Sequence, residues 1–144
     1  METTILLIGS EYSDAIVRLI NAANSTIDIL MFDWRVYFAD VSSPVSLINQ
    51  AICSAVKRGV RVRAVLNSQI AQKMLVKNGI DARTLSSKKL LHCKAVVLDG
   101  KLAVVGSHNL TSNAMESNFE LSAVIHDGDF CKNFSVFFEK LCQW

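Results

Sequence analysis

The amino-acid sequence predicts a mixed α/β fold in which a partly parallel β-sheet is flanked by helices on both faces. Apolar runs of strand length alternate along the chain with segments whose apolar residues recur at helical spacing. Hydrophobic residues make up 51% of the 144 residues, which is enough for a sizeable core. We therefore expect residues 1–144 to form a single domain.

Strands and helices alternate through the first 85 residues. The clearest helix start is at Ser43 and Pro44, because serine is a good cap and proline fits the first turn. Gly59 is expected to end that helix. The predicted strands cover residues 3–8, 25–33, 60–66 and 80–85, and the predicted helices cover residues 10–23, 44–58 and 68–78.

The second half is predicted to be a hairpin, a strand and a helix. Asp99 and Gly100 lie between two aliphatic runs, which is a strong hairpin signal. A loop or short helix is expected over residues 110–117, and a strand over residues 118–125. A last helix is expected to begin after its cap, Asp127, with an apolar face of Phe130, Phe134, Phe137, Phe138 and Leu141.

The predicted hairpin carries polar side chains that are costly to bury without partners: His92, Lys94, Ser107 and Asn109. If Asp99 and Gly100 form a two-residue turn, His92 lies opposite Ser107. Strand alternation then places all four side chains on one face at the open end of the hairpin. Asp99 would be about 23 Å from His92 at the usual strand rise, so we expect it to serve the turn.

The four side chains suit attack on a phosphodiester. A lysine can neutralise phosphate oxygens, and serine and asparagine can donate directed hydrogen bonds. A neutral histidine is a competent nucleophile near pH 7 without a metal. Its other ring nitrogen needs an acceptor, for which Glu120 in the following strand is the candidate. Separate surface residues on an edge hairpin are the alternative interpretation.

The spacing of these residues resembles the HKD signature of the phospholipase D superfamily. The match comprises His92-x-Lys94, Asp99 and Gly106-Ser107-x-Asn109. In its length and its single motif, the chain is most similar to the small bacterial endonucleases of that superfamily. The resemblance implies a phospholipase D-like fold and a hydrolase that needs neither metal nor other cofactor.

The resemblance also implies roles for the matching residues. His92 would be nucleophile or acid around a covalent phosphohistidine intermediate. Lys94 and Asn109 would bind the phosphate, Ser107 would support the site, and Glu120 would orient His92. Asp99, Gly100 and Gly106 would be structural.

One motif is not enough for in-line displacement at phosphorus, because nucleophile and proton donor must lie on opposite sides. His108 follows Ser107, so strand alternation turns it away from the site, and His126 ends the following strand, where a surface or cap role is expected. We therefore expect a C2 homodimer in which two His92 side chains share one phosphate.

Nucleic acid is the first expected substrate. Lys88 and Lys89 precede the catalytic strand, and Arg61 and Arg63 lie on another strand, although they could simply be solvated. The net charge of +2 is too small to indicate nucleic-acid binding by itself.

An aromatic loop after the second strand is a further possible substrate contact. Trp34, Arg35, Tyr37 and Phe38 are expected to be exposed there, where they could stack on unpaired bases or enter a lipid interface. Core packing is the alternative for these aromatics. A phospholipid phosphodiesterase of phospholipase D or cardiolipin-hydrolase type, and a non-catalytic nucleic-acid or protein binding module, therefore remain as alternative functions.

No secretory signal and no apolar stretch of about 20 residues is visible in the sequence. We therefore expect a cytoplasmic protein without stable membrane insertion.

Overall fold

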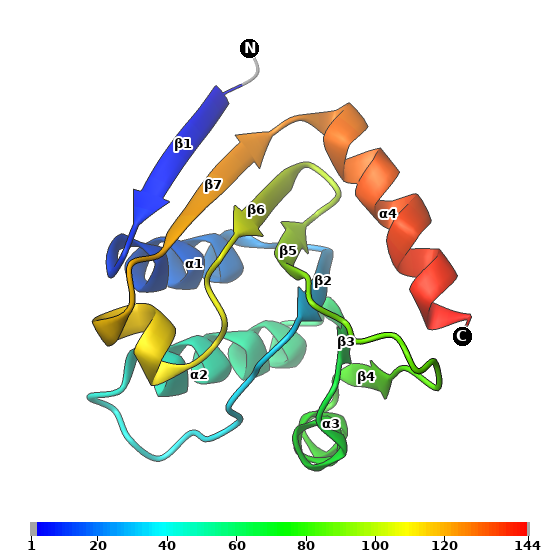
Figure 1. Cartoon of the computed structure of the whole chain (residues 1–144), viewed down its shortest axis with the longest axis horizontal. Helices are drawn as coiled ribbons and strands as arrows, with labels where there is room; N and C mark the ends of the chain where they lie inside the picture. The colour runs from blue at the N-terminus through cyan, green and yellow to red at the C-terminus, as the bar shows by residue number, and fades with distance from the viewer. Residues whose placement is uncertain (1–2, 144) are drawn as a thin grey trace.

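Seven strands form one mixed sheet in the computed structural model, which describes residues 3–143. Their order across the sheet is β1-β7-β6-β5-β2-β3-β4 (Figure 1). Strands β2, β3 and β4 are parallel to one another, and the other pairings are antiparallel, which confirms the predicted partly parallel sheet. The strands are β1 (Thr3–Ile8), β2 (Thr26–Met31), β3 (Arg61–Leu66), β4 (Asp81–Thr84), β5 (Lys94–Leu98), β6 (Leu102–Gly106) and β7 (Leu121–His126).

Helices cover both faces of the sheet, as the sequence predicted. Helices α1, α2 and α3 pack on one face, and α4 packs on the other (Figure 1). A short π-helical segment, η1, follows β6 within the stretch expected to be a loop or short helix. The bounds are α1 (Glu11–Ala22), α2 (Pro44–Lys57), α3 (Gln69–Lys77), η1 (Asn113–Ser117) and α4 (Gly128–Cys142).

The predicted caps begin their helices. The Ser43 hydroxyl accepts a hydrogen bond from the Ser46 N–H, with Pro44 in the first turn of α2. The Asp127 carboxylate accepts from the N–H groups of Asp129 and Phe130 at the start of α4. Such caps stabilise a helix by about 1 kcal/mol each, because they satisfy N–H groups that have no partner within the helix.

Strand β2 explains why the central sheet sequence is almost continuously apolar. Ile27, Ile29 and Met31 pack toward α1 and α2, while Leu30 packs toward α4 beside Phe138. A strand buried on both faces cannot show the alternation of apolar and polar residues that a half-exposed strand shows. Each fully buried side chain of this kind contributes about 1.5–3 kcal/mol.

Helix α4 buries a narrower stripe than the sequence predicted. Phe138 and Leu141 are buried, but Phe130 and Phe137 are 37% and 44% exposed. The reason is geometric, since Phe137 is one residue from Phe138 and therefore about 100° away around the helix. The prediction that both belong to the buried face is wrong.

The predicted register of the hairpin is wrong by one residue. Leu98 pairs with Leu102, and Ala95 pairs with Val105. Lys101 donates its N–H to the Leu98 carbonyl at 3.1 Å but remains in the turn, so the connection has three residues rather than two. The paired residues end at Ala95 and Val105, so His92 and Ser107 lie beyond the ladder and the predicted pairing between them is not made.

None of the helices within residues 3–143 is long and apolar enough to cross a lipid bilayer.

Candidate active site

The predicted site residues lie where three strands end or begin, at one end of the sheet. His92 precedes β5, Ser107 and Asn109 follow β6, and Glu120 precedes β7. Backbone hydrogen bonds continue the ladder past the strand ends, from Phe32 N–H to the Cys93 carbonyl at 2.9 Å. This is the lower end of the sheet in Figure 1, opposite the hairpin turn.

His92 and Lys94 contact each other directly. Lys94 Nζ lies 3.2 Å from both the Nδ1 atom and the carbonyl oxygen of His92. A lysine ammonium can only donate, so Nδ1 accepts here and the ring proton lies on Nε2. Within the described residues no hydrogen bond uses Nε2, and the exposed imidazole can therefore present it to a ligand.

The backbone of Asp33 determines which end of the Asn109 amide is available. The Asp33 N–H donates to Asn109 Oδ1 at 3.2 Å. Because the oxygen is used, the Nδ2 group of Asn109 remains as a donor for an anionic ligand.

Glu120 accepts hydrogen bonds from Ser107 and Asn118 rather than from His92. Ser107 Oγ donates to Glu120 Oε2, and Asn118 Nδ2 donates to Oε1 at 3.1 Å. Among residues 3–143 no hydrogen bond joins Glu120 to His92. Both carboxylate oxygens therefore have partners, and the expected direct contact between Glu120 and His92 is not made within one chain.

Two shallow cavities meet at Ser107. The first, of about 490 Å³, is lined by His92, Lys94, Gly106 and Ser107 and by phenylalanines of α4. The second, of about 480 Å³, is lined by Ser107, Glu120, Asn118, Phe119 and Ile8, among others. The structure thus brings His92, Lys94 and Ser107 to one cavity and Glu120 to the next.

Asp99 lies at the far end of the hairpin, where its carboxylate stabilises the turn before β2. It accepts from the N–H groups of Asn24, Ser25 and Thr26 and from the Ser25 hydroxyl, at 2.8–3.2 Å. Partial burial alone would raise the pKa of Asp99, but these hydrogen bonds outweigh it and lower the pKa to about 2. Its backbone is left-handed, with φ of 54°, as is that of Gly100, with φ of 63°.

Gly106 is required by the close approach of β6 to β7. A Cβ atom at this position would lie 2.2 Å from Ser122 Oγ and 2.4 Å from the Leu121 carbonyl oxygen. No side chain larger than hydrogen fits without moving the backbone that carries Ser107 and Glu120.

His108 points away from the site, in the direction expected from strand alternation. It is buried and stacks on Tyr12 with ring centroids 4.3 Å apart. Nε2 donates to the Gly9 carbonyl at 2.9 Å, and Nδ1 accepts from the Ser122 hydroxyl at 2.8 Å. Burial lowers the pKa of His108, which favours this neutral form.

The aromatic loop is not the exposed surface that the sequence predicted. Trp34 is only 4% exposed, and its Nε1 donates to Asn49 Oδ1 at 2.8 Å. A buried indole with a satisfied N–H is a core residue, so the prediction of Trp34 as a substrate contact is wrong. Tyr37 and Phe38 are partly buried against the same core, whereas Arg35 is exposed beside Asp33 at 3.3 Å.

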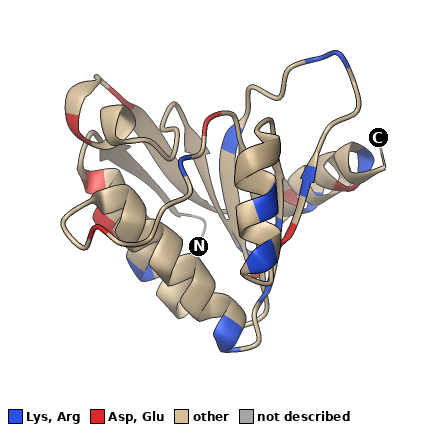
Figure 2. Ribbon diagram, turned by 90° about the horizontal axis from the view of Figure 1, so that it is seen from below, with Lys and Arg blue, Asp and Glu red and all other residues tan. Residues whose placement is uncertain are grey.

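The basic residues predicted to attract nucleic acid differ in how available they are. Arg63 forms ion pairs with Asp28 and Glu139 at 2.8 and 2.6 Å. It is therefore not available to bind nucleic acid, and the prediction that it attracts the substrate is wrong. Lys88 and Lys89 are exposed in the loop after β4. Figure 2 shows basic and acidic segments spread over several elements, with a basic segment at the tip of a protruding loop.

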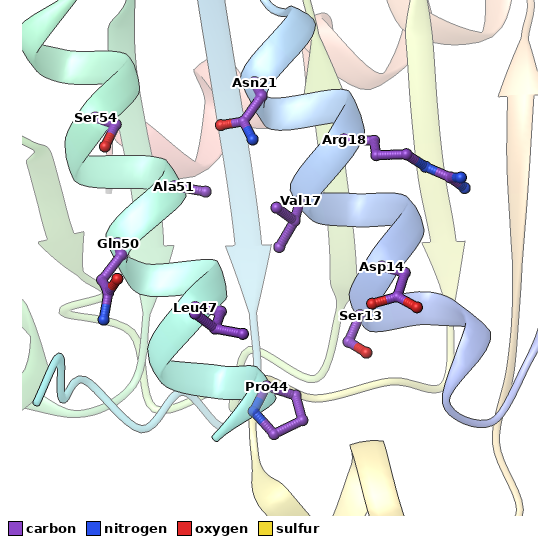
Figure 3. A pocket seen from close by; sticks show the side chains of 10 residues that line it. All are labelled: Ser13, Asp14, Val17, Arg18, Asn21, Pro44, Leu47, Gln50, Ala51 and Ser54. Atoms are coloured by element: carbon purple, nitrogen blue, oxygen red, sulfur yellow. The ribbon is translucent and has the colours of Figure 1, made fainter. Parts of the chain in front are cut away.

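A larger cavity lies away from these residues. A groove of about 620 Å³ runs between α1 and α2 on the face opposite α4 (Figure 3). Its walls mix polar side chains such as Asp14, Arg18 and Gln50 with Val17 and Leu47. Within residues 3–143, no group of three or more His, Cys, Asp and Glu side chains could hold a metal ion.

Two residues that contact this site were missed by the sequence analysis. Phe32 packs its ring on His92, with centroids 4.5 Å apart, and Lys94 Nζ is 5.1 Å from the Phe32 centroid. Asn67 bonds the backbone on either side of that contact. The available signal was weak, since Phe32 ends an apolar run and Asn67 directly follows a predicted strand.

Comparison with known proteins identifies the family of the chain. The family described as "Cardiolipin synthase, PLD-like domain" matches residues 16–142. Cardiolipin synthase A of Buchnera aphidicola is 34% identical over 95 residues, which are 58% of this chain and 19% of that protein. Human mitochondrial cardiolipin hydrolase is 28% identical over 143 residues, which are 94% of this chain and 52% of that protein. The chain therefore spans about a fifth and about half of these longer relatives.

Solved structures of similar length share the fold. Nuc from Salmonella typhimurium, a phospholipase D family member, has a TM-score of 0.82 at 21% identity, with 98% of this chain and 95% of that chain covered. NucT from Helicobacter pylori has a TM-score of 0.77 at 16% identity, with 99% and 97% covered.

Proposed function

Because the chain belongs to the family of phospholipase D-like domains, we propose that it is a metal-independent phosphodiesterase that hydrolyses nucleic acid. The observation that carries the proposal is the direct contact of Lys94 Nζ with His92 at the mouth of a cavity. A cation touching an exposed imidazole provides both the charge that attracts a phosphate and the nucleophile that attacks it.

The proposed reaction has two displacements at phosphorus. Nε2 of one His92 attacks the phosphate, a P–N bond forms, and the P–O bond to the leaving group breaks. A second histidine donates its Nε2 proton to the departing oxygen. That histidine then takes a proton from water, and the hydroxide breaks the P–N bond. Lys94 and Asn109 bind the phosphate oxygens through both steps.

Substrate would also prepare the nucleophile. At rest the Lys94 ammonium occupies Nδ1 of His92, which keeps the ring proton on Nε2. The acid of the pair needs a proton on both ring nitrogens, so Lys94 has to leave Nδ1 in that chain as well. Phosphate oxygens that draw Lys94 away would let Nδ1 carry the proton and make the Nε2 lone pair available.

The second histidine is proposed to come from a second copy of the chain. His108 is buried and committed to Gly9 and Ser122, so it is unable to play this part. Exposed apolar side chains beside the site support a partner there, because such patches mark interfaces. We name them the site-side apolar surface: Leu6, Ile8, Phe119, Leu121, Phe130 and Phe137.

The geometry of β1 and β7 makes this surface continuous with the site. Ile8 pairs with Leu121, so the two side chains share one face. Ile8 and Leu121 also line the cavity that contains Glu120. Since Glu120 makes no contact with His92 of its own chain, the imidazole that it is proposed to orient is that of the partner subunit.

A sedimentation experiment tests the homodimer. Leu121→Lys places a charge in the middle of the site-side apolar surface and is expected to produce monomers with little activity. Ile70→Lys is the matched control, because Ile70 is also apolar and exposed but lies on α3. A monomer that hydrolyses phosphodiesters as fast as the dimer would contradict the shared site.

Lipid phosphodiesters are the second candidate substrate. Relatives named cardiolipin synthase and cardiolipin hydrolase, together with the apolar surroundings of the site, favour it. Two observations favour nucleic acid instead. Lys88 and Lys89 are exposed in the loop that leads to His92, and Trp34 is buried rather than ready to enter a membrane.

One assay separates the candidate functions. The protein is incubated in excess EDTA with single-stranded DNA, duplex DNA, RNA and vesicles of phosphatidylcholine or cardiolipin, beside His92→Ala. We expect His92-dependent cleavage of a nucleic acid. Cleavage of lipid alone would favour the second candidate, and nucleic-acid binding that survives His92→Ala without any cleavage would indicate a binding module.

A further inference from the structure

We infer that Phe32 and Asn67 are positioning residues that together hold His92 in place for catalysis; the inference rests on the proposed function of His92. Neither residue belongs to the motif, and both come from the parallel half of the sheet. Phe32 directly follows β2, and Asn67 directly follows β3.

Phe32 provides a surface on which the imidazole rests. Its ring centroid is 4.5 Å from that of His92, with 36° between the planes. His92 is otherwise exposed and lies just outside β5, so strand hydrogen bonds do not restrain its side chain. The same ring lies 5.1 Å from Lys94 Nζ, where its negative face attracts the ammonium. One aromatic ring therefore places the two groups that the reaction needs.

Asn67 joins the segment that carries His92 to the segment that carries Phe32. Its Nδ2 donates to the Leu91 carbonyl at 2.8 Å and to the Phe32 carbonyl at 3.0 Å. Its Oδ1 accepts from the Leu91 N–H at 3.2 Å. All these bonds are to backbone, so they restrain the chain on both sides of the ring contact irrespective of side-chain rotamers.

The segment that carries His92 is anchored in the core. Leu91 is only 3% exposed and packs with Leu30, Val65 and Phe138 under α4. The residue before His92 is thus held through its side chain by the core and through its backbone by Asn67. This explains how a residue outside any strand can be oriented, since an error of about 1 Å in a reacting group can cost about 100-fold in rate.

Four variants test the inference. Phe32→Leu removes the ring while keeping an apolar side chain, and Phe32→Tyr keeps the ring. Asn67→Asp keeps the acceptor for the Leu91 N–H but replaces the donor to both carbonyls. Gln72→Ala is the matched control, because Gln72 Nε2 donates to the Ala82 carbonyl at 3.0 Å, an amide-to-backbone bond of the same kind beside β4.

The first measurement does not depend on activity. In the NMR spectrum the imidazole protons of His92, assigned by their loss in His92→Ala, should be shifted upfield by the Phe32 ring. We expect Phe32→Leu and Asn67→Asp to move them toward their free-peptide positions, and Phe32→Tyr and Gln72→Ala to leave them in place. Resonances that stay unmoved in both Phe32→Leu and Asn67→Asp would overturn the inference.

The second measurement is kinetic, with bis-p-nitrophenyl phosphate in EDTA. Phe32→Leu and Asn67→Asp should lower kcat by about 10- to 100-fold with little change in KM, while Phe32→Tyr retains most activity. An equal loss in Gln72→Ala would overturn the inference by showing a general loss of structure. If the NMR shifts respond as expected while the wild-type protein cleaves nothing, the ring contact stands and the proposed function fails.

Discussion

The two ends of the hairpin formed by β5 and β6 carry motif residues that differ in whether their polar groups already have partners. At the closed end, the carboxylate of Asp99 accepts hydrogen bonds from three backbone N–H groups and a hydroxyl of residues 24–26. At the open end, His92 is exposed and Asn109 keeps its amide donors available. The comparison separates polar groups whose hydrogen bonds are satisfied within the fold from polar groups that can still bind a ligand.

The difference arises from what surrounds each end. The turn at Asp99 packs against the chain between α1 and β2, whose N–H groups would otherwise lack partners. The open end faces two shallow cavities and a surface of exposed apolar side chains. Substitutions at the two ends should therefore affect different properties, stability at the closed end and chemistry at the open end.

His92→Ala should have the largest effect on activity. Removing the proposed nucleophile is expected to lower kcat at least about 10⁴-fold toward bis-p-nitrophenyl phosphate in EDTA. Because His92 is exposed, the midpoint of thermal unfolding should barely move. Substantial remaining activity in a sample free of contaminating phosphodiesterase would remove His92 from the mechanism.

Asn109→Asp should have the next largest effect. The aspartate can still accept the Asp33 N–H, so the local fold is retained, but a negative oxygen replaces the amide donor. We expect kcat/KM to fall about 10²- to 10³-fold, and more than in Asn109→Ala, because the new charge repels the phosphate. Should the two variants lose activity equally, the amide would not face the phosphate.

Gly106→Ala tests a part of the open end that is structural. The added Cβ would lie 2.4 Å from the Leu121 carbonyl oxygen, and a backbone atom cannot rotate away as a flexible side chain can. We expect destabilisation of about 2–3 kcal/mol in urea unfolding, as for other overpacked sites. Gly128→Ala is the control, since nothing lies within 4 Å of a Cβ there. Equal stability of the two variants would contradict the close approach of β6 and β7.

Asp99→Asn should have the smallest effect and only on stability. Asparagine tolerates the left-handed backbone with φ of 54° but lacks the charge and one acceptor, so we expect a loss of about 1–2 kcal/mol at pH 7. The rate per folded molecule should stay within about twofold, because catalysis at the open end does not use this residue. A large loss of kcat without a change in stability would place Asp99 in the reaction.

The stability difference between wild type and Asp99→Asn should also depend on pH. The folded pKa of Asp99 is lowered from 3.8 to about 2, so the ionised carboxylate stabilises the fold above pH 4. This contribution should decrease as the pH falls from about 4 through the folded pKa of about 2, because the carboxylate is protonated first in the unfolded and then in the folded protein. Urea midpoints at pH 7 and pH 3 measure the convergence, and a constant difference would mean that the charge is not the cause.

Much of the fold was accessible from the sequence because local signals agreed with the tertiary packing. The caps at Ser43 and Asp127 were predicted, and the helices that follow them begin where expected. The hairpin was predicted from Asp99 and Gly100, but its register was not, since these residues are compatible with connections of two or three residues.

The site was accessible only in part for a related reason. His92, Lys94, Ser107 and Asn109 were identified by residue type and spacing, which a motif records directly. Phe32 and Asn67 lie about 60 and 25 residues from His92 in sequence and reach it only because β5 lies beside β2. Trp34 was wrongly predicted to be exposed, because its neighbours in the sequence are polar. The sequence does not show that Asn49 provides a buried acceptor for its indole N–H.

The sequence by itself determined the class of the fold, the ends of its helices and the set of groups available for chemistry, because these depend on neighbouring residues and on side-chain type. Only the tertiary structure decided which of the other polar groups are paired within the fold, as Arg63 is, and which remain available, as His92 and the Asn109 amide are. The physical reason is that a polar group's availability depends on partners that strand pairing brings from distant parts of the chain.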